Sequence, residues 1–517
     1  MPRARPFRRR PLTPKPRGHP AAGLVPFRPQ RFDSIPHSMK PHPCLLGATL
    51  ALAGAAALFG QTSKQDVLAR IDATRSPYEQ LALRIWGFAE VGYQETQSSA
   101  ALQEALRQAG FTIQAGAAGM PTAFTATFGS GSPVIGIMGE FDALPGVSQT
   151  ADPFRQERAD AKAGHACGHH LFGAGSVEAA VAIKDWLTAT GTKGTLRFYG
   201  TPAEEGGAGK VYLVRDGLMQ DVDVMLHWHA GDRNLVTNSP SLANKSGKFR
   251  FHGLASHAAA APDRGRSALD GVEAMDHMVN MMREHVPADT RIHYVITRGG
   301  EAPNVVPAFA EVYYYVRNPS RDQVLSIWER VEKAAQGAAL GTGTTVDWEI
   351  IHGVYDLLPN DALAKAMHAN LVAVGGVSYD EKEKAFAAEI GKTLPGGRPA
   401  SLELAATIQP FDYVREGGGS TDVGDVSWNV PTIGLRTATW VPGTPGHSWQ
   451  AVACGGTTIG LKGMQVAAKT LALTAMDLYT QPDLIKRAKA EFDQRRGPDF
   501  VYRSMLGDRK PPLDYRN

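Results

Sequence analysis

The sequence predicts an α/β fold in which a large domain built on a mostly parallel sheet carries a smaller inserted α+β domain. Three observations lead to this prediction. The chain has 517 residues, 43% of them hydrophobic, which is enough to form cores for two or three domains of roughly 150 residues each. Short apolar runs alternate with stretches of helical periodicity in both outer parts of the chain. The part between them is richer in alternating, β-branched and aromatic residues.

The first sixty residues are typical of targeting sequence. Residues 1–38 contain nine prolines and no apolar periodicity, so we expect a disordered or untranslated extension. A second candidate start, Met39, is followed by Lys40 and an uncharged run over 44–60, which predicts a signal peptide at 39–60. The protein would then be periplasmic or secreted, or cytoplasmic if that segment is not used; an uncleaved anchor is the alternative. No other run approaches about 18 apolar residues, so no integral membrane segment is expected in the mature chain.

The small positive net charge of the chain comes from its beginning. The first forty residues hold ten Lys and Arg residues but only one acidic residue, Asp33, which leaves 44 basic and 50 acidic residues for the rest. A nucleic-acid-binding domain needs a basic patch on its folded surface. No nucleic-acid partner is therefore expected.

The large domain is expected over residues 64–242 and 356–480. Helices are expected at 65–110, with a break around two glycines, and a long apolar-rich helix at 461–479. Three short apolar runs predict buried strands, and helical stretches separate them; the strands are expected at 133–138, 195–199 and 222–226, and the helices at 176–188 and 210–216. Strand and helix alternation of this kind favours a parallel sheet covered on both faces.

The inserted α+β domain is expected over residues 243–355. Four strand-like segments and two helical ones make up this part; the strands are expected at 247–252, 291–297, 311–316 and 345–350, and the helices at 268–283 and 321–338. Residues 481–517 are interpreted as a polar C-terminal tail.

Side chains that bind metals follow the predicted strands of the large domain. Ligands bind in the crevice beyond the carboxyl ends of parallel strands, and five candidate metal ligands fall in or near loops of that kind: Cys167, His169, Glu205, His229 and His447. Each alone is a weak signal, because most such residues have structural roles. Five ligands exceed what one four-coordinate ion needs, so two divalent ions sharing a water are the economical interpretation. Thiolate and imidazole suit zinc by their softness, with manganese or cobalt as alternatives set by availability.

Two further carboxylates receive roles in this hypothesis. Glu204 points away from its neighbour if the pair is extended, and could then act as general base. Asp142 is expected to support a ligand histidine. Alternatives remain open: His227 could replace His229 as ligand because both point to the same face of a strand, and Cys167 could form a disulfide with Cys454.

Eight motifs in order carry a family resemblance: GEFDALPG, GHACGHHLFG, TPAEEGGAGK, HWH, SHAAAAPDRGRSALDGV, GGEAPNVVP, STDVGDVSW and GTPGHSWQ. Over residues 66–480 the sequence resembles the M20-type metal-dependent amidohydrolases. The resemblance implies a two-metal hydrolase domain with a small lid and dimerisation domain, and it implies the same ligands and the same general base, Glu204. It also implies that His257 reaches a partner's active site to stabilise an oxyanion, and that Asn304 and Arg317 hold the substrate's carbonyl or carboxylate. In place of the Asp or Asn of many relatives, this sequence has His170.

The expected activity is therefore hydrolysis of the amide bond of an N-acylated amino acid, with p-aminobenzoyl-glutamate as the substrate that the resemblance suggests. The expected assembly is a homodimer or a heterodimer with a related subunit. Three alternatives remain: a dipeptidase using the same site, a thiol hydrolase with Cys167 as nucleophile and His169 or His170 as base, and a non-catalytic binding or partner subunit.

Overall fold

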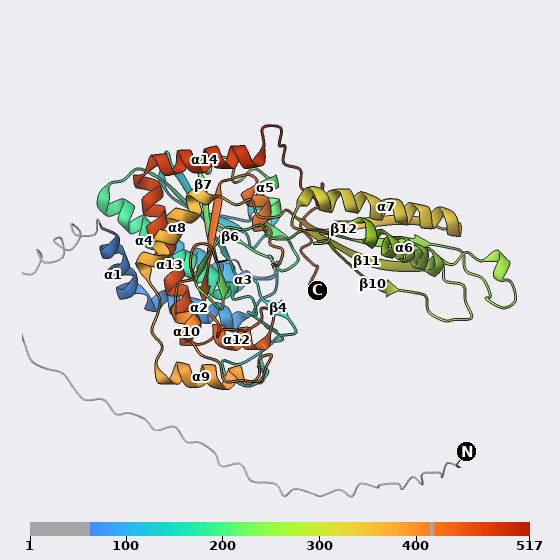
Figure 1. The fold of residues 1–517 in the computed structure, drawn as a ribbon, viewed down its shortest axis with the longest axis horizontal. Coiled ribbons are helices and arrows are strands. Elements are labelled where there is room, and N and C mark those ends of the chain that lie inside the picture. The colour runs from blue at the N-terminus through green and yellow to red at the C-terminus, as the bar shows by residue number, and fades with distance from the viewer. Residues whose placement is uncertain (1–62, 414–417, 517) are drawn as a thin grey trace, which may run out of the picture. The chain divides into compact units, whose positions relative to one another are not determined.

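A seven-stranded sheet forms the framework of the larger part of the chain (Figure 1). The computed structural model describes residues 63–413 and 418–516, so the extension at 1–38 and the signal peptide at 39–60 lie outside the described residues. The strand order is β1-β2-β6-β3-β7-β13-β8. The strands are β1 (Thr112–Ala115), β2 (Phe124–Ser130), β3 (Val134–Glu140), β6 (Gly194–Thr201), β7 (Val224–Gly231), β8 (Leu235–Thr237) and β13 (Thr432–Ala438).

The four central strands of this sheet are parallel, as the sequence predicts. β3 pairs in parallel with both β6 and β7, and β7 pairs in parallel with β13, while β1, β2 and β8 add antiparallel edges. Every residue of β3 is buried, which explains why this strand is an uninterrupted run of apolar and small residues up to Glu140. The prediction of a mixed α/β fold with a mostly parallel sheet is confirmed.

Helices pack on this sheet and on one another. α4 contacts β3, β6 and β7, and α13 contacts α4 as well as β7 and β13. The helices of this part are α1 (Lys64–Thr74), α2 (Ser76–Phe88), α3 (Thr96–Gln108), α4 (His169–Thr190), α5 (Gly209–Arg215), α8 (Asp361–Val374), α9 (Glu381–Gly391), α10 (Glu403–Ala406), α11 (Val423–Ser427), α12 (Trp449–Gly455), α13 (Thr458–Thr480) and α14 (Pro482–Arg496). A two-stranded ribbon, β4 (Leu144–Pro145) with β5 (Ala163–Gly164), lies in the loop after β3.

A second, antiparallel sheet follows in the chain, and its order is β10-β11-β9-β12. Its strands are β9 (Ala243–His252), β10 (Arg291–Arg298), β11 (Phe309–Asn318) and β12 (Thr345–Val354), and its helices are α6 (Ala268–Met282) and α7 (Arg321–Thr342). Both helices contact β9 and β11 (Figure 1), and together with the sheet they form a separate hydrophobic core around Phe249, Val312 and Trp328. These four strands and two helices are the ones expected between 243 and 355.

Two elements extend beyond their predicted limits in a way that affects the site. β7 continues through His229 to Gly231, so the histidines expected after this strand are part of it. α4 begins at His169 rather than near 176. Both extensions contain polar side chains, so the apolar pattern of the sequence alone did not predict them.

The polar tail expected at 481–517 is instead part of the packed structure. α14 buries Leu484, Ala488 and Phe492, an apolar stripe at helical spacing within a mostly charged segment. Beyond α14, Met505 and Leu506 are buried, each in a different hydrophobic core.

Within the described part of the chain, none of the helices is long and apolar enough to cross a membrane.

A buried carboxylate joins this C-terminal segment to the rest of the fold. Asp425, in α11, accepts hydrogen bonds from the backbone N–H of Tyr355 (2.9 Å) and from the hydroxyl of Tyr502 (2.8 Å). Burial, aided by the nearby charge of Asp422, raises the pKa of Asp425 to about 7. The folded protein therefore retains a proton that the unfolded chain releases near the ordinary pKa of an aspartate.

This shift predicts that folding stability falls between about pH 4 and pH 7 because of Asp425. The stabilisation is complete below the pKa of the unfolded chain and is lost as the pH rises through the folded value. Asp425→Asn removes this titration, so the difference in unfolding free energy between the variant and the wild type should shift in favour of the variant by up to about 4 kcal/mol across this range. Urea denaturation of both proteins in chelator at several pH values measures it. A constant difference across the range would contradict the prediction.

Candidate metal centre

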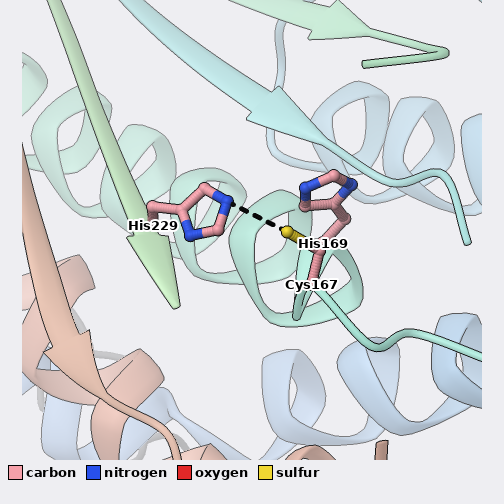
Figure 2. Close-up of side chains that lie close together, drawn as sticks. All are labelled: Cys167, His169 and His229. Atoms are coloured by element: carbon pink, nitrogen blue, oxygen red, sulfur yellow. Dashed lines mark hydrogen bonds between the residues drawn. The ribbon is translucent and has the colours of Figure 1, made fainter. Parts of the chain in front are cut away.

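Cys167 lies at the centre of the candidate site. Its Sγ is 3.4 Å from His229 Nε2, and the ligand atoms of Cys167, His169 and His229 all lie within 4.8 Å of one another. Figure 2 shows the two imidazole rings facing the sulfur, one from β7 and one from the first turn of α4. A thiolate and two imidazoles at this spacing are a donor set that a soft divalent cation accepts.

The same sulfur belongs to a second group. Cys167, Glu205 and His447 also bring one ligand atom each within 4.8 Å of the others. His447 Nε2 lies 3.2 Å from Glu205 Oε1, and the His447 side chain is 58% exposed whereas that of Glu205 is 9% exposed. The two groups therefore share Cys167, with the second group closer to solvent.

Glycine and turn conformations bring these segments together. Gly168 has φ +78°, and a Cβ at this position would lie 2.3 Å from the Cβ of Ala230, so only glycine lets the Cys167 loop approach the end of β7 this closely. His447 also has positive φ, 59°, and its backbone N–H donates to the carbonyl of Ala166 (3.0 Å). That hydrogen bond ties the His447 turn to the residue before Cys167.

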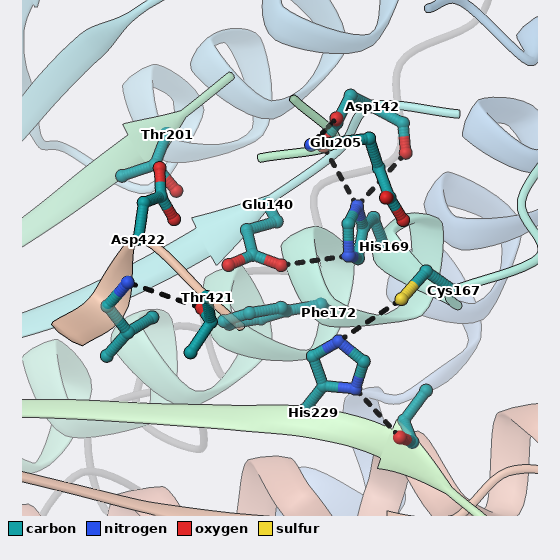
Figure 3. A network of polar contacts seen from close by, with 12 residues as sticks. Glu140, Asp142, Cys167, His169, Phe172, Thr201, Glu205, His229, Thr421 and Asp422 are labelled. Atoms are coloured by element: carbon teal, nitrogen blue, oxygen red, sulfur yellow. Dashed lines mark hydrogen bonds and ion pairs between the residues drawn. The ribbon is translucent and has the colours of Figure 1, made fainter. Parts of the chain in front are cut away.

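Asp142 holds two of the candidate ligands in place (Figure 3). His169 Nδ1 donates to Asp142 Oδ1 (2.8 Å), and the backbone N–H of Glu205 donates to Asp142 Oδ2 (2.9 Å). The first bond leaves His169 Nε2 facing Glu140 and the ligand groups, and the second fixes the backbone of Glu205. This geometry fits the supporting role that the sequence predicts for Asp142.

Glu204 faces a different set of neighbours from Glu205. Its carboxylate groups with that of Glu140 and with His169, again with ligand atoms within 4.8 Å of one another. His169 Nε2 lies 3.0 Å from Glu140 Oε2. The adjacent glutamates thus separate, one toward Cys167 and His447 and the other toward Glu140, although they lie in a turn and not in the extended loop on which the expectation rested.

Beneath the site, a fully buried lysine balances two carboxylates. Lys210 Nζ lies 2.6 Å from Glu140 Oε1 and 2.7 Å from Asp422 Oδ1, and the Lys210 backbone N–H donates to Asp422 Oδ2 (2.9 Å). Although burial opposes it, the Lys210 charge holds the pKa of Glu140 well below its usual range. A buried ammonium between two carboxylates is stable only as a unit, because each uncompensated charge would be costly in the interior.

Four titratable groups of the site have pKa values far from their usual ones. Burial disfavours the Cys167 thiolate, but the adjacent imidazoles of His229 and His169 outweigh it and hold the pKa of the thiol well below its usual value. Burial and the Cys167 charge raise the pKa of Glu205 to about 7. Hydrogen bonds to Cys167 and Glu205 raise the pKa of His447 to about 10, and burial together with Glu205 and Glu140 places the pKa of Glu204 well above its usual value.

These features fit divalent cations in the site. His169 Nε2, Glu140 Oε2 and Glu205 Oε1 are buried atoms without a hydrogen-bond partner of good geometry among the described residues, and all three belong to the three ligand groups. Buried polar atoms are almost always satisfied. Divalent ions held by the two groups that share Cys167 would satisfy His169 Nε2 and Glu205 Oε1, while Glu140 Oε2 faces His169 Nε2.

The residues predicted for the lid lie on the second sheet and in its loops. His257 is exposed in the loop after β9, where its Nδ1 accepts from the N–H groups of Ala259 and Ala260 (3.2 Å each). The exposed Asn304 lies beside it, because His257 and Val305 form a β-bridge and the Asn304 carbonyl accepts from Ala258 N–H (3.0 Å). Arg317, on β11, lies 3.4 Å from Ser420 Oγ. His257 and Asn304 are therefore one local unit, separate from the three ligand groups of this chain.

The structure shows where the side chains lie in the alternatives that the sequence left open. Cys167 and Cys454 are both free, so they form no disulfide. His227 is buried beside Gly434, at a site where a Cβ would lie 2.2 Å from His227 Nε2, and it belongs to none of the ligand groups found among the described residues. His170 turns to the carbonyl of Gly455 (3.0 Å). His229 rather than His227, and His169 rather than His170, therefore faces Cys167.

Part of this network was not predicted from the sequence. Glu140, Lys210 and Asp422 lie inside the motifs GEFDALPG, TPAEEGGAGK and STDVGDVSW, so their place in the motifs was a usable signal. Glu95 gave no comparable signal: it accepts from Thr122 Oγ1 and from Ala203 N–H, each at 2.9 Å, and burial raises its pKa to about 8.

Known proteins resemble this chain in sequence and in fold. The family model for peptidase family M20/M25/M40 matches residues 136–400. The chain is 41% identical over 451 residues to the B subunit of p-aminobenzoyl-glutamate hydrolase from Escherichia coli (strain K12), a match that covers 82% of this chain and 93% of that protein. It is 29% identical over 446 residues to Xaa-Arg dipeptidase of Mus musculus, covering 83% and 92%. A dinuclear metal-binding peptidase of family M20 from Bacillus subtilis has a similar fold, with TM-score 0.56, 17% identity and coverage of 80% and 99%.

Because Cys167 is common to both ligand groups, its loss should affect all metal binding. We predict that Cys167→Ala lowers the affinity for divalent metal at least about tenfold, since a thiolate contributes strongly to such sites. Metal analysis after dialysis, followed by competition with a chromophoric chelator, measures the change. Cys454→Ala is the matched control, because that thiol is buried away from the ligand groups, and it should retain wild-type metal content. Equal metal content in the two variants would contradict the assignment.

Proposed function

The chain belongs to peptidase family M20/M25/M40 and is a metal-dependent amidohydrolase, and we propose that it cleaves the amide bond of an N-acylated amino acid. The observation that carries this proposal is the pair of three-residue ligand groups that share Cys167. A shared ligand between two such groups suits two divalent ions a few ångströms apart. We assign His169 and His229 to one ion and Glu205 and His447 to the other.

The donor set favours zinc among the divalent ions. Each group combines the Cys167 sulfur with one or two imidazoles, and the second adds a carboxylate. Such ligands match the softness of zinc, although manganese or cobalt can occupy similar sites when they are more available. Divalent ions bound there supply Lewis acidity, which polarises the substrate carbonyl and lowers the pKa of water.

Glu204 is proposed as the general base. Its carboxylate lies within 4.8 Å of a ring nitrogen of His169 and is outside the two groups that share Cys167, so those two groups do not need it as a ligand. Its raised pKa, due to burial and to Glu205 and Glu140, suits a group that accepts a proton from the attacking water and then gives it to the leaving amine. Asp142 accepts from His169 Nδ1 and so fixes the orientation of that ring beside Glu204.

The substrate suggested by the relatives is p-aminobenzoyl-glutamate, the compound after which the Escherichia coli hydrolase is named. The chain offers a cation for such an acidic leaving group: Arg317 has a buried Nε without a hydrogen-bond partner among the described residues, and a guanidinium binds carboxylates in two parallel hydrogen bonds. A dipeptide substrate is the second candidate, since Xaa-Arg dipeptidase is also a relative. An arginine cation at this place favours an acidic leaving amino acid over a basic one.

The second sheet with α6 and α7 is proposed to serve as a lid and dimerisation domain, Ala243 to Tyr355. Its His257 and Asn304 are exposed and bound to each other's loops, which leaves their side chains available to a second protomer. We propose that His257 enters the partner's site and donates to the oxyanion of the tetrahedral intermediate, with Asn304 beside the substrate. A second protomer would be an identical chain or a related subunit, since the Escherichia coli relative is itself named as a subunit.

The base assignment predicts a separation of metal binding from turnover. Glu204→Gln should retain the metal content of the wild type but lower kcat on p-aminobenzoyl-glutamate by about 10²–10⁴-fold, because the amide cannot accept the proton. Product analysis by chromatography, together with metal analysis, tests both parts. Glu381→Gln, on the exposed surface of α9, is the control and should keep full activity. Substantial activity in Glu204→Gln, or loss of its metal, would exclude the role.

The dimer assignment predicts complementation between two inactive variants. Glu204→Gln and His257→Ala should each be inactive alone, since every site in either homodimer lacks one group. Co-expressed, they form mixed dimers in which one site combines an intact Glu204 with the partner's intact His257. About a quarter of wild-type activity should then return if half of the dimers are mixed. If His257 acted within its own chain, the mixed dimers would contain no complete site and activity would stay absent.

A further inference from the structure

The segment after α14 crosses the molecule and is anchored along its length. The Tyr355 hydroxyl donates to the carbonyl of Arg503 (2.7 Å), and Arg215 donates to that of Arg509 (2.7 Å). Met505 and Leu506 are buried, in separate hydrophobic cores. The path of the chain up to residue 510 is therefore held by contacts that do not involve the metal centre.

The end of this segment reaches the backbone of a candidate ligand. The hydroxyl of Tyr515 donates to the carbonyl oxygen of Glu205 (3.0 Å), and Arg516 Nη2 donates to the same oxygen. The guanidinium of Arg516 also lies over the Tyr515 ring, 4.7 Å from its centroid. One carbonyl oxygen thus accepts from two side chains more than 300 residues away in the sequence, and one of them is charged.

The surroundings of Tyr515 are shaped for this contact. A Cβ at Gly92 would lie 2.2 Å from the Tyr515 hydroxyl, and a Cβ at Gly206 would lie 3.5 Å from its ring. The ring of Tyr93 meets that of Tyr515 edge to face, with centroids 5.6 Å apart. Gly92 in particular leaves room where any other residue would displace the phenol.

The loop that receives this contact is strained. Ala203 and Ala208, which flank it, have φ of 56° and 57°, values that cost about 1 kcal/mol or more for residues other than glycine. Between them the N–H of Gly206 donates to the carbonyl of Glu204 (2.7 Å), a tight turn centred on Glu205. Asp142 holds the N–H of Glu205, and the C-terminal segment holds its carbonyl. The backbone N–H and the backbone carbonyl of Glu205 are therefore both held by hydrogen bonds.

We propose that Tyr515 and Arg516 are positioning residues for Glu205, which fix the turn so that the Glu205 carboxylate points to Cys167 and His447 while that of Glu204 points to Glu140. The inference rests on the proposed function, since it concerns the same site. Without the two donors, the strained turn can relax by rotating the Glu205 peptide. That rotation would move both glutamates, because the two residues share the turn.

A purely structural role is distinguishable from this one. The anchors at Arg503, Met505, Leu506 and Arg509 remain when the two terminal contacts are removed, so the fold should be kept. Loss of positioning should instead weaken the ion held by Glu205 and slow the step that uses Glu204. A second possibility is that Arg516 binds the substrate's carboxylate, because its Nε is buried and has no hydrogen-bond partner among the described residues.

The test compares Tyr515→Phe, Arg516→Gln and the double variant with the wild type. Leu513→Ala is the matched control, because Leu513 lies in the same segment and is 41% exposed. Zinc affinity is measured by competition with a chromophoric chelator, kcat and KM on p-aminobenzoyl-glutamate at saturating zinc, and Tm on the metal-free proteins. For the double variant we expect zinc affinity and kcat to fall about tenfold each, the loss of roughly one hydrogen bond to a charged donor. KM should stay within about twofold, and the metal-free Tm should match that of the control.

Three results would overturn the proposal. Unchanged zinc affinity and kcat in the double variant would show that the contacts do not position Glu205. A rise in KM alone, with Arg516→Gln responsible, would assign Arg516 to substrate binding. A drop in the metal-free Tm that parallels the loss of activity would make the contacts structural. If the wild type hydrolyses no acyl-amino acid, the proposed function fails, but the zinc measurements still test the positioning of Glu205.

Discussion

The crowding of acidic groups into one buried volume is the constraint on which the rest of the site depends. Glu140, Glu204 and the Cys167 thiolate lie near His169, and Glu205 lies near the same thiolate. Like charges in the interior repel strongly unless cations compensate them. Lys210 compensates the inner side through Glu140. On the outer side the carboxylate of Glu205 faces the imidazole of His447, whose pKa is raised to about 10, so a divalent ion bound there would displace a proton from that ring. The permanent ammonium of Lys210 therefore stabilises the buried carboxylates, and metal ions complete the charge compensation of the site.

The sheet topology makes this crowding possible. β3, β6, β7 and β13 are parallel neighbours, so their carboxyl ends lie at one edge. Glu140 ends β3, the two glutamates follow β6, His229 lies near the end of β7, and His447 follows β13. α4 begins at the same edge and adds His169. Distant segments thus meet without any long-range signal in the sequence, because the parallel register aligns them.

The parts of the fold that were predictable are those with strong local periodicity. The buried strand β3 and the amphipathic helix α7 lie close to where the apolar pattern puts them. The start of α4 was missed because Gly173 and Gly175 weaken a helical pattern. Those glycines serve packing: a Cβ at Gly173 would lie 2.8 Å from the carbonyl of Glu140, and one at Gly175 would lie 2.7 Å from Met464. Close packing against α4 therefore requires glycines at these positions, and the glycines weaken the helical pattern by which the sequence would have identified the helix.

For the site, the sequence alone established which kinds of donor the protein supplies, since thiol, imidazole and carboxylate groups follow apolar strands in ordered motifs. It could not choose between neighbours: His229 rather than His227 faces Cys167, because the direction of each side chain depends on the packing around β7. Nor could it reveal Lys210 beneath Glu140 or Tyr515 on the carbonyl of Glu205. Identity and spacing are local properties of a chain, whereas charge compensation and contact between remote segments arise only when the folded backbone brings them within a few ångströms.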